Sequence, residues 1–144
     1  QVTLSEIHPD GSEVYVQSGW LRASHRKLDE ARSSEVRPVQ THLESDAAPL
    51  PAEEYVLARV EIYPFAHVWR AGSRVRLTVS APGGDRAAWK FRALEGSGDV
   101  TVEIAHAPGL PSRLVLPVVP GVAAPEARPA CNSLRGQPCR PGVN

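Results

Sequence analysis

The sequence predicts an all-β fold, a two-layer β-sandwich built from short strands. Nearly every segment alternates apolar and polar residues with a period of two, which is typical of strands with one buried face. Fourteen prolines and eleven glycines divide the 144 residues into short pieces. About eight strands at spacings of roughly 10 residues, without a convincing helix, favour a sandwich. The length fits one domain with a single core.

The first two strands are expected at residues 2–7 (VTLSEI) and 13–17 (EVYVQ). Between them, His8-Pro9-Asp10-Gly11 is a turn signal, because proline, aspartate and glycine each favour turn conformations. The pattern therefore predicts a β-hairpin.

The next strand is expected at residues 19–26, GWLRASHR. Alternation would place Leu21 and Ala23 on the core side. The opposite side would carry Trp20, Arg22, Ser24 and Arg26. This side would then present two arginines and one tryptophan on a single strip of surface, which calls for a functional explanation.

The middle of the chain is predicted to hold the longest strand. Residues 27–37 read as a loop, and the Pro/Ala-rich residues 46–54 lead into the strand 54–63 (EYVLARVEIY), which Pro64 ends. The side chains sharing one face of it are Val56, Ala58, Val60 and Ile62.

The later strands follow the same alternation. In residues 74–82 (RVRLTVSAP), Val75, Leu77 and Val79 should point inward while Arg74, Arg76 and Thr78 point outward. Further strands are expected at 89–94, 99–106 and 112–118, with a turn at 96–98. We expect residues 122–144 to form an irregular Pro/Ala-rich tail.

Charge and hydropathy exclude several classes of protein. The chain has 16 basic and 16 acidic residues, so no net field favours nucleic acid or an anionic membrane. No apolar run of about 18 residues is present, and no signal peptide is visible. The chain starts with Gln1 inside a strand-like run, which we interpret as a processed or truncated product.

Cys131 and Cys139 lie near the C-terminus with seven residues between them. They are too few for a metal site and have the wrong spacing for a redox pair. A small disulfide loop is favoured over two free thiols. If it forms, the compartment is oxidising and the parent protein is secreted or periplasmic.

Candidate catalytic and metal-binding motifs are missing from the pattern. No G-x-S-x-G nucleophile elbow occurs, PGGDR (82–86) lacks phosphate-binding spacing, and the five histidines show no metal-ligand spacing. We therefore expect no catalytic residue, metal or cofactor. His67 and His106 are interpreted as hydrogen-bonded structural histidines.

Three tryptophans, Trp20, Trp69 and Trp89, could act in two ways. They could form a stacking platform for sugars, or fill a core edge or an interdomain contact. The second interpretation is favoured, because large amphipathic rings are enriched at such contacts.

Five motifs in order resemble one family. They are PDG at 9–11, GWLRASHR, VRPVQTH (36–42), YVLARVEIYPFAHVWRAGSRVRLTVSAP (55–82) and PSRLVLPVVPG (111–121). Together they are similar to the C-terminal jelly-roll domain of the Xaa-Pro dipeptidyl-peptidase and cocaine esterase type of acyl hydrolase. The resemblance covers about residues 1–121 and implies a jelly-roll, galactose-binding-like sandwich.

The resemblance also implies which domain of the parent protein carries the catalytic residues. An α/β-hydrolase domain in the parent would supply the Ser-Asp-His triad, and this sandwich would be non-catalytic and packed against it. Two family histidines are replaced here by Ser73 and Leu110. The family domain has about two further strands before residue 1, so we predict an open sheet edge beside residues 2–7, filled by another chain or left open in a fragment.

The residues predicted to contact the other domains are Trp20, Arg22, Arg26, Trp69 and Arg76. Arginine suits this role because its guanidinium binds carboxylates bidentately. The alternative function is a carbohydrate-binding or adhesive module, which would need a coplanar pair of exposed rings. The sequence does not choose between esterase and peptidase specificity in the parent, or fix the oligomeric state.

Overall fold

The computed structural model describes residues 1–82 and 101–123. Its regular elements are the strands β1 (Val2–Ile7), β2 (Glu13–Gly19) and β3 (Arg74–Val79) and two single-turn 3-10 helices, η1 (Ala23–His25) and η2 (Glu44–Asp46). This strand-dominated content confirms the all-β class. Within the described ranges, no helix has the length and hydrophobicity needed to cross a bilayer.

The chain divides into two compact units. The first contains Gln1–Leu21, Val60–Ser80 and residues 118–123, and therefore all three strands. The second contains Arg22–Arg59 and the described residues from Ala81 to Pro117.

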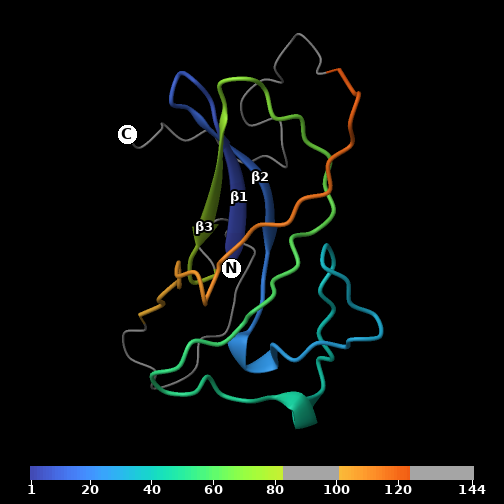
Figure 1. Cartoon of the computed structure of the whole chain (residues 1–144), viewed down its shortest axis with the longest axis vertical. Coiled ribbons are helices and arrows are strands. Elements are labelled where there is room, and N and C mark those ends of the chain that lie inside the picture. The colour runs from blue at the N-terminus through green and yellow to red at the C-terminus, as the bar shows by residue number, and fades with distance from the viewer. Residues whose placement is uncertain (83–100, 124–144) are drawn as a thin grey trace. The chain divides into compact units, whose positions relative to one another are not determined.

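The first unit is built on a three-stranded antiparallel sheet in the order β2-β1-β3 (Figure 1). The predicted hairpin is confirmed, because β1 pairs with β2 from Val2↔Gly19 to Ile7↔Glu13. In its turn, the amide of Gly11 donates to the carbonyl of His8 over 2.9 Å. Gly11 has φ 83°, a left-handed conformation that glycine adopts without steric cost.

The predicted open edge beside residues 2–7 is wrong. Every residue of β1 is paired with β2 on one side and with β3 on the other. β3 occupies the position that we expected to be open, because residues 74–79 return antiparallel to β1 with Leu77 opposite Leu4. Among the described residues, β1 is therefore the central strand.

Residues opposite one another in antiparallel strands share a face. Leu77 lies on the face of Leu4, and Arg76 on the face of Ser5. The predicted alternation of β3 is therefore confirmed, but its burial is not. Val75, Leu77 and Val79 are 50%, 41% and 44% exposed, whereas Leu4 is fully buried.

The core lies on β1 and β2 because the chain from residue 60 packs beside β2. The buried apolar side chains are Leu4, Ile7 and Val16. Ser18 accepts a 3.3 Å hydrogen bond from the amide of Tyr63. A methyl group built on Gly19 would overlap the carbonyl oxygen of Glu61, so only glycine allows this approach.

The predicted strand at 19–26 is wrong. β2 ends at Gly19, and Ala23–His25 form η1 instead. Local hydrogen bonds stabilise this turn: the His25 amide donates to the Arg22 carbonyl at 2.7 Å, and the Arg26 guanidinium donates to the Ala23 carbonyl at 3.1 Å. A turn that satisfies its own polar groups needs no neighbouring strand.

The long strand predicted at 54–63 is also absent, because none of these residues is assigned to a strand. Residues 101–106 and 112–118 form no strand either, and Ala107 and Leu110 close a tight turn between them. Period-two alternation sets which side chains can share a face, but a strand also needs a partner for its backbone. The jelly-roll topology stays a prediction.

The predicted loop at 27–37 is confirmed and has internal order. Its start pairs with the residues after it through an isolated bridge between Leu28 and Gln40. The amide of Asp29 donates to the Val39 carbonyl at 2.8 Å. The predicted strand 89–94, the turn 96–98 and the tail beyond residue 123 lie outside the described residues.

Candidate functional site

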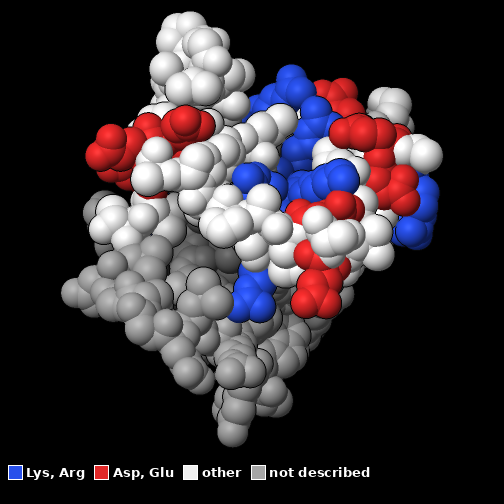
Figure 2. All heavy atoms as spheres, turned by 90° about the horizontal axis from the view of Figure 1, so that it is seen from below, with Lys and Arg blue, Asp and Glu red and all other residues white. Residues whose placement is uncertain are grey.

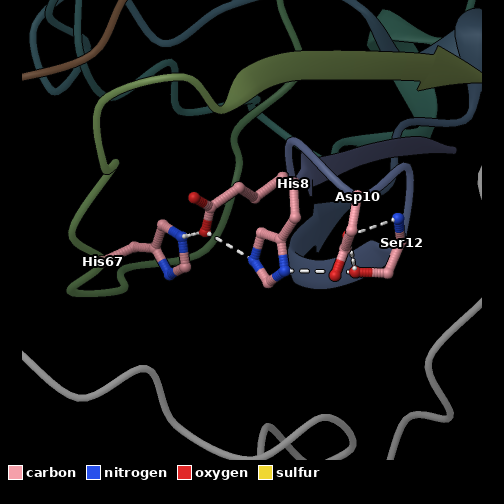
Figure 3. A network of polar contacts seen from close by, with 5 residues as sticks. His8, Asp10, Ser12 and His67 are labelled. Carbon is pink, nitrogen blue, oxygen red and sulfur yellow. Dashed lines mark hydrogen bonds and ion pairs between the residues drawn. The ribbon is translucent and has the colours of Figure 1, made fainter.

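The first unit contains a buried carboxylate that two histidines approach (Figure 3). Glu6 on β1 is 1% exposed. Its Oε2 atom lies 2.7 Å from Nε2 of His67 and 3.6 Å from Nε2 of His8. His67 was predicted to be a hydrogen-bonded structural histidine, and this contact confirms it.

The sheet places Glu6 inside the molecule. Glu6 follows Val2 and Leu4 at the next position with a period of two, so its side chain lies on the same face of β1 as the fully buried Leu4. Its direct neighbours across the sheet are Val14 and Val75. A carboxylate among apolar neighbours needs hydrogen-bond donors from outside the sheet.

The turn extends the network away from the carboxylate. Nδ1 of His8 lies 3.2 Å from the Ser12 hydroxyl, which donates to Oδ1 of Asp10 over 2.6 Å. The Ser12 amide also donates to Oδ1 of Asp10, at 2.9 Å. Asp10 therefore forms a side-chain turn that fixes both Ser12 and the His8 ring.

The pKa of Glu6 lies below its ordinary value. Burial alone raises this pKa, but the Ser73 hydroxyl, the His67 hydrogen bond and the charges of His67 and His8 lower it by more. Neither Ser73 Oγ nor Glu6 Oε1 has a partner in hydrogen-bond geometry, so we assign the Ser73 effect to its nearby dipole. His67 is the bonded partner that keeps the carboxylate ionised.

Ser12, His8 and Glu6 superficially share the composition of a hydrolase triad. In a triad, the serine hydroxyl donates to histidine and backbone amides stabilise the oxyanion. Here the Ser12 hydroxyl donates to Asp10, and the amides of Gly11 and Ser12 are used inside the turn. The arrangement can share protons and brace the hairpin, but its geometry does not activate a nucleophile.

Two predicted contact residues, Trp20 and Trp69, lie in the first unit and contact neighbours in their own chain. The Trp20 indole donates to Oε1 of Gln1 at 3.0 Å and its ring centroid lies 5.5 Å from that of Tyr63, tilted by 46°. Trp69 meets the His67 ring at 4.6 Å and 70°. Neither pair is the coplanar platform that the carbohydrate alternative requires, and Trp89 lies outside the described residues.

The three predicted contact arginines belong to different units, Arg76 to the first and Arg22 and Arg26 to the second. Arg76 is in the first unit, where its guanidinium donates to Glu13 at 2.9 Å. Arg26 is in the second unit and donates to the carbonyls of Ala48 at 2.7 Å and Ala23 at 3.1 Å. Arg22 is exposed, and no hydrogen bond or ion pair joins its guanidinium to another described residue.

The surface charges are mixed. The face in Figure 2 carries basic and acidic side chains interspersed. In the second unit, Lys27 pairs with Asp46 at 2.6 Å, and this contact lowers the pKa of Asp46. Such pairing agrees with the balanced composition of the chain.

Sequence reasoning missed the role of Glu6. A signal existed, because Glu6 occupies an inward position in the alternation of Val2 and Leu4. Its partners could not be predicted, because His67 is 61 residues away.

Cys131 and Cys139 lie outside the described residues. In residues 1–82 and 101–123, no group of three or more His, Cys, Asp or Glu could hold a metal ion.

The fold and this network define an all-β domain whose titratable residues brace its own hairpin. Residues 1–89 match the family model of the X-Pro dipeptidyl-peptidase C-terminal non-catalytic domain. The chain belongs to this family, which confirms the resemblance drawn from its motifs.

Two curated relatives share more of the chain. Proteins named "putative serine esterase" in Mycobacterium bovis and Mycobacterium tuberculosis are each 31% identical over 120 residues. The matched stretch covers 82% of this chain but 18% of each relative. No solved structure matches the chain.

Proposed function

We propose that the chain is the accessory C-terminal domain of a serine hydrolase and packs against its α/β-hydrolase domain. The family match over residues 1–89 carries this proposal, and the names of the mycobacterial relatives support an ester-cleaving parent. The parent would act on acyl esters or on peptides with proline second from the N-terminus.

Chemistry in the parent would proceed through an acyl-enzyme on a serine outside this chain. The domain would contribute contact surface and help to shape the substrate entrance. Arg22 supports this role because its exposed guanidinium can bind a carboxylate of the neighbouring domain bidentately. Trp20 and Trp69, which lie in the first unit, would add apolar contact area toward the hydrolase domain.

Arg22→Ala in the full-length parent tests the docking role. We expect a lower thermal midpoint and a lower kcat/KM, because the neighbouring domain loses a charged partner. Arg113→Ala is the matched control, since Arg113 is also an exposed arginine, and among the described residues its ion pair is with exposed Glu35 at 3.3 Å. Such a surface pair contributes about 0–1 kcal/mol. Equal behaviour of both variants would reject Arg22 as a docking residue.

We further propose that the parent is secreted or periplasmic, with Cys131 bonded to Cys139. The spacing of the two cysteines supports a small ring, and disulfides persist in oxidising compartments. Thiol titration of the unfolded protein, with and without reductant, tests this. Two reactive thiols before reduction would contradict the proposal.

A further inference from the structure

We propose that Glu6, His8 and His67 form an acid-released clasp that holds residues 60–73 against the central strand β1. This clasp is independent of the docking function. It joins the first strand of the chain to a segment that arrives about sixty residues later, and it would be released by protonation of one buried carboxylate.

The contacts between this segment and the sheet differ in chemistry. The Tyr63 amide donates to the Ser18 carbonyl, and the Gln17 side chain donates to the Pro64 carbonyl, each at 3.3 Å. Both are long bonds between neutral groups. The His67–Glu6 contact is shorter, at 2.7 Å, and involves an ionisable acceptor. Charge-assisted hydrogen bonds of this kind are about twice as strong as neutral ones.

The groups facing Glu6 come from several elements. The turn contributes His8, and the 60–73 segment contributes His67 and Ser73, the residue just before β3. The sheet neighbours on β2 and β3 are Val14 and Val75, which carry no charge. Among described residues, the charged groups acting on Glu6 are thus the two imidazoles.

Protonation of Glu6 changes what its carboxyl group can accept. The carboxylate accepts a hydrogen from Nε2 of His67, whereas a protonated acid carries its own hydrogen and attracts a histidine cation less. The short Glu6–His67 hydrogen bond therefore loses its charge-assisted character once Glu6 is neutral. The segment should then separate from β1.

The direction of the pH effect follows from the pKa of Glu6. This pKa is lower in the folded chain than the ordinary value, which is about 4.3 in an unfolded chain. The stability that the clasp contributes is therefore complete above the unfolded pKa of Glu6. It is lost as the pH falls through the pKa of Glu6 in the folded chain. At neutral pH, the clasp is closed.

Hydrogen–deuterium exchange of the full chain tests this, with rates corrected for the intrinsic effect of pH. We expect peptides within 60–73 to exchange about tenfold faster at pH 3 than at pH 7, which corresponds to one hydrogen bond of about 1.4 kcal/mol. Peptides from the β1–β2 pairing should change much less. Circular dichroism at both pH values shows whether the sheet persists.

Glu6→Gln should remove the pH dependence, because glutamine cannot ionise, and should raise exchange of 60–73 already at pH 7. His67→Gln removes the other partner of the same hydrogen bond, so we expect the same result. This variant replaces Glu6→Gln in the test if Glu6→Gln does not fold. Glu13→Gln is the control, because Glu13 is a buried carboxylate that pairs with Arg76 instead. Wild-type exchange that is equal at pH 3 and pH 7, or that rises together with global unfolding, would overturn the clasp.

Discussion

Gly19→Ala should destabilise the chain more than a surface substitution, because of where Gly19 lies. The new methyl group would overlap the carbonyl oxygen of Glu61 and lie 2.8 Å from its carbonyl carbon and 3.2 Å from Cα of Ile62. All three are backbone atoms, so no side-chain rotation can relieve the overlap. The segment from residue 60 must move away from β2.

The cost has two parts. Crowding of a packed site typically costs about 1–3 kcal/mol. Separation of the segment also weakens the Tyr63–Ser18 hydrogen bond, worth about 0.5–1.5 kcal/mol. We therefore expect a loss of about 2–4 kcal/mol in the free energy of unfolding, measured by urea denaturation followed by circular dichroism.

Gly109→Ala is the matched control, because nothing lies within 4 Å of its new methyl group. It should change the free energy of unfolding by less than about 0.5 kcal/mol. If Gly19→Ala is as stable as Gly109→Ala, the approach of residues 60–64 to β2 is not as described, and the reasoning fails.

Three further changes test the turn and the two internal arginines. Gly11→Ala should cost about 1–2 kcal/mol through its positive φ alone, and Gly11→Asn less; equal stability of both in urea denaturation would contradict the turn. Arg26→Ala should cost about 1 kcal/mol, since the guanidinium donates to backbone carbonyls; a full rescue by Arg26→Lys would argue against a specific fork geometry. Arg76→Ala should cost about 1–3 kcal/mol by leaving the buried carboxylate of Glu13 unpaired, and thermal melts should show a smaller loss for the double change with Glu13→Gln.

The elements with local signals were predictable from the sequence. The hairpin follows from alternation on both sides of a Pro-Asp-Gly turn, and the face assignment of β3 follows from its period of two. These features depend on neighbours within a few residues. The strand at 19–26 failed because a 3-10 turn with its own hydrogen bonds competes with the same alternation.

The long-range features were not predictable. The sequence gives no indication that residues 74–79 return beside β1, because strand partners are chosen by the packing of the whole domain. The Glu6–His67 pair depends on the same return of the chain. Of the predicted contact residues, Arg26 and Arg76 bind groups in their own chain, which a linear pattern of exposed arginines cannot show.

The central claim is that this chain is a non-catalytic domain that docks on a hydrolase domain. The direct test is a calorimetric titration of residues 1–144 into the parent hydrolase domain produced without this region. We expect saturable one-to-one binding that Arg22→Ala weakens and Arg113→Ala leaves unchanged. A titration without binding heat at any temperature, with both proteins folded, would contradict the account.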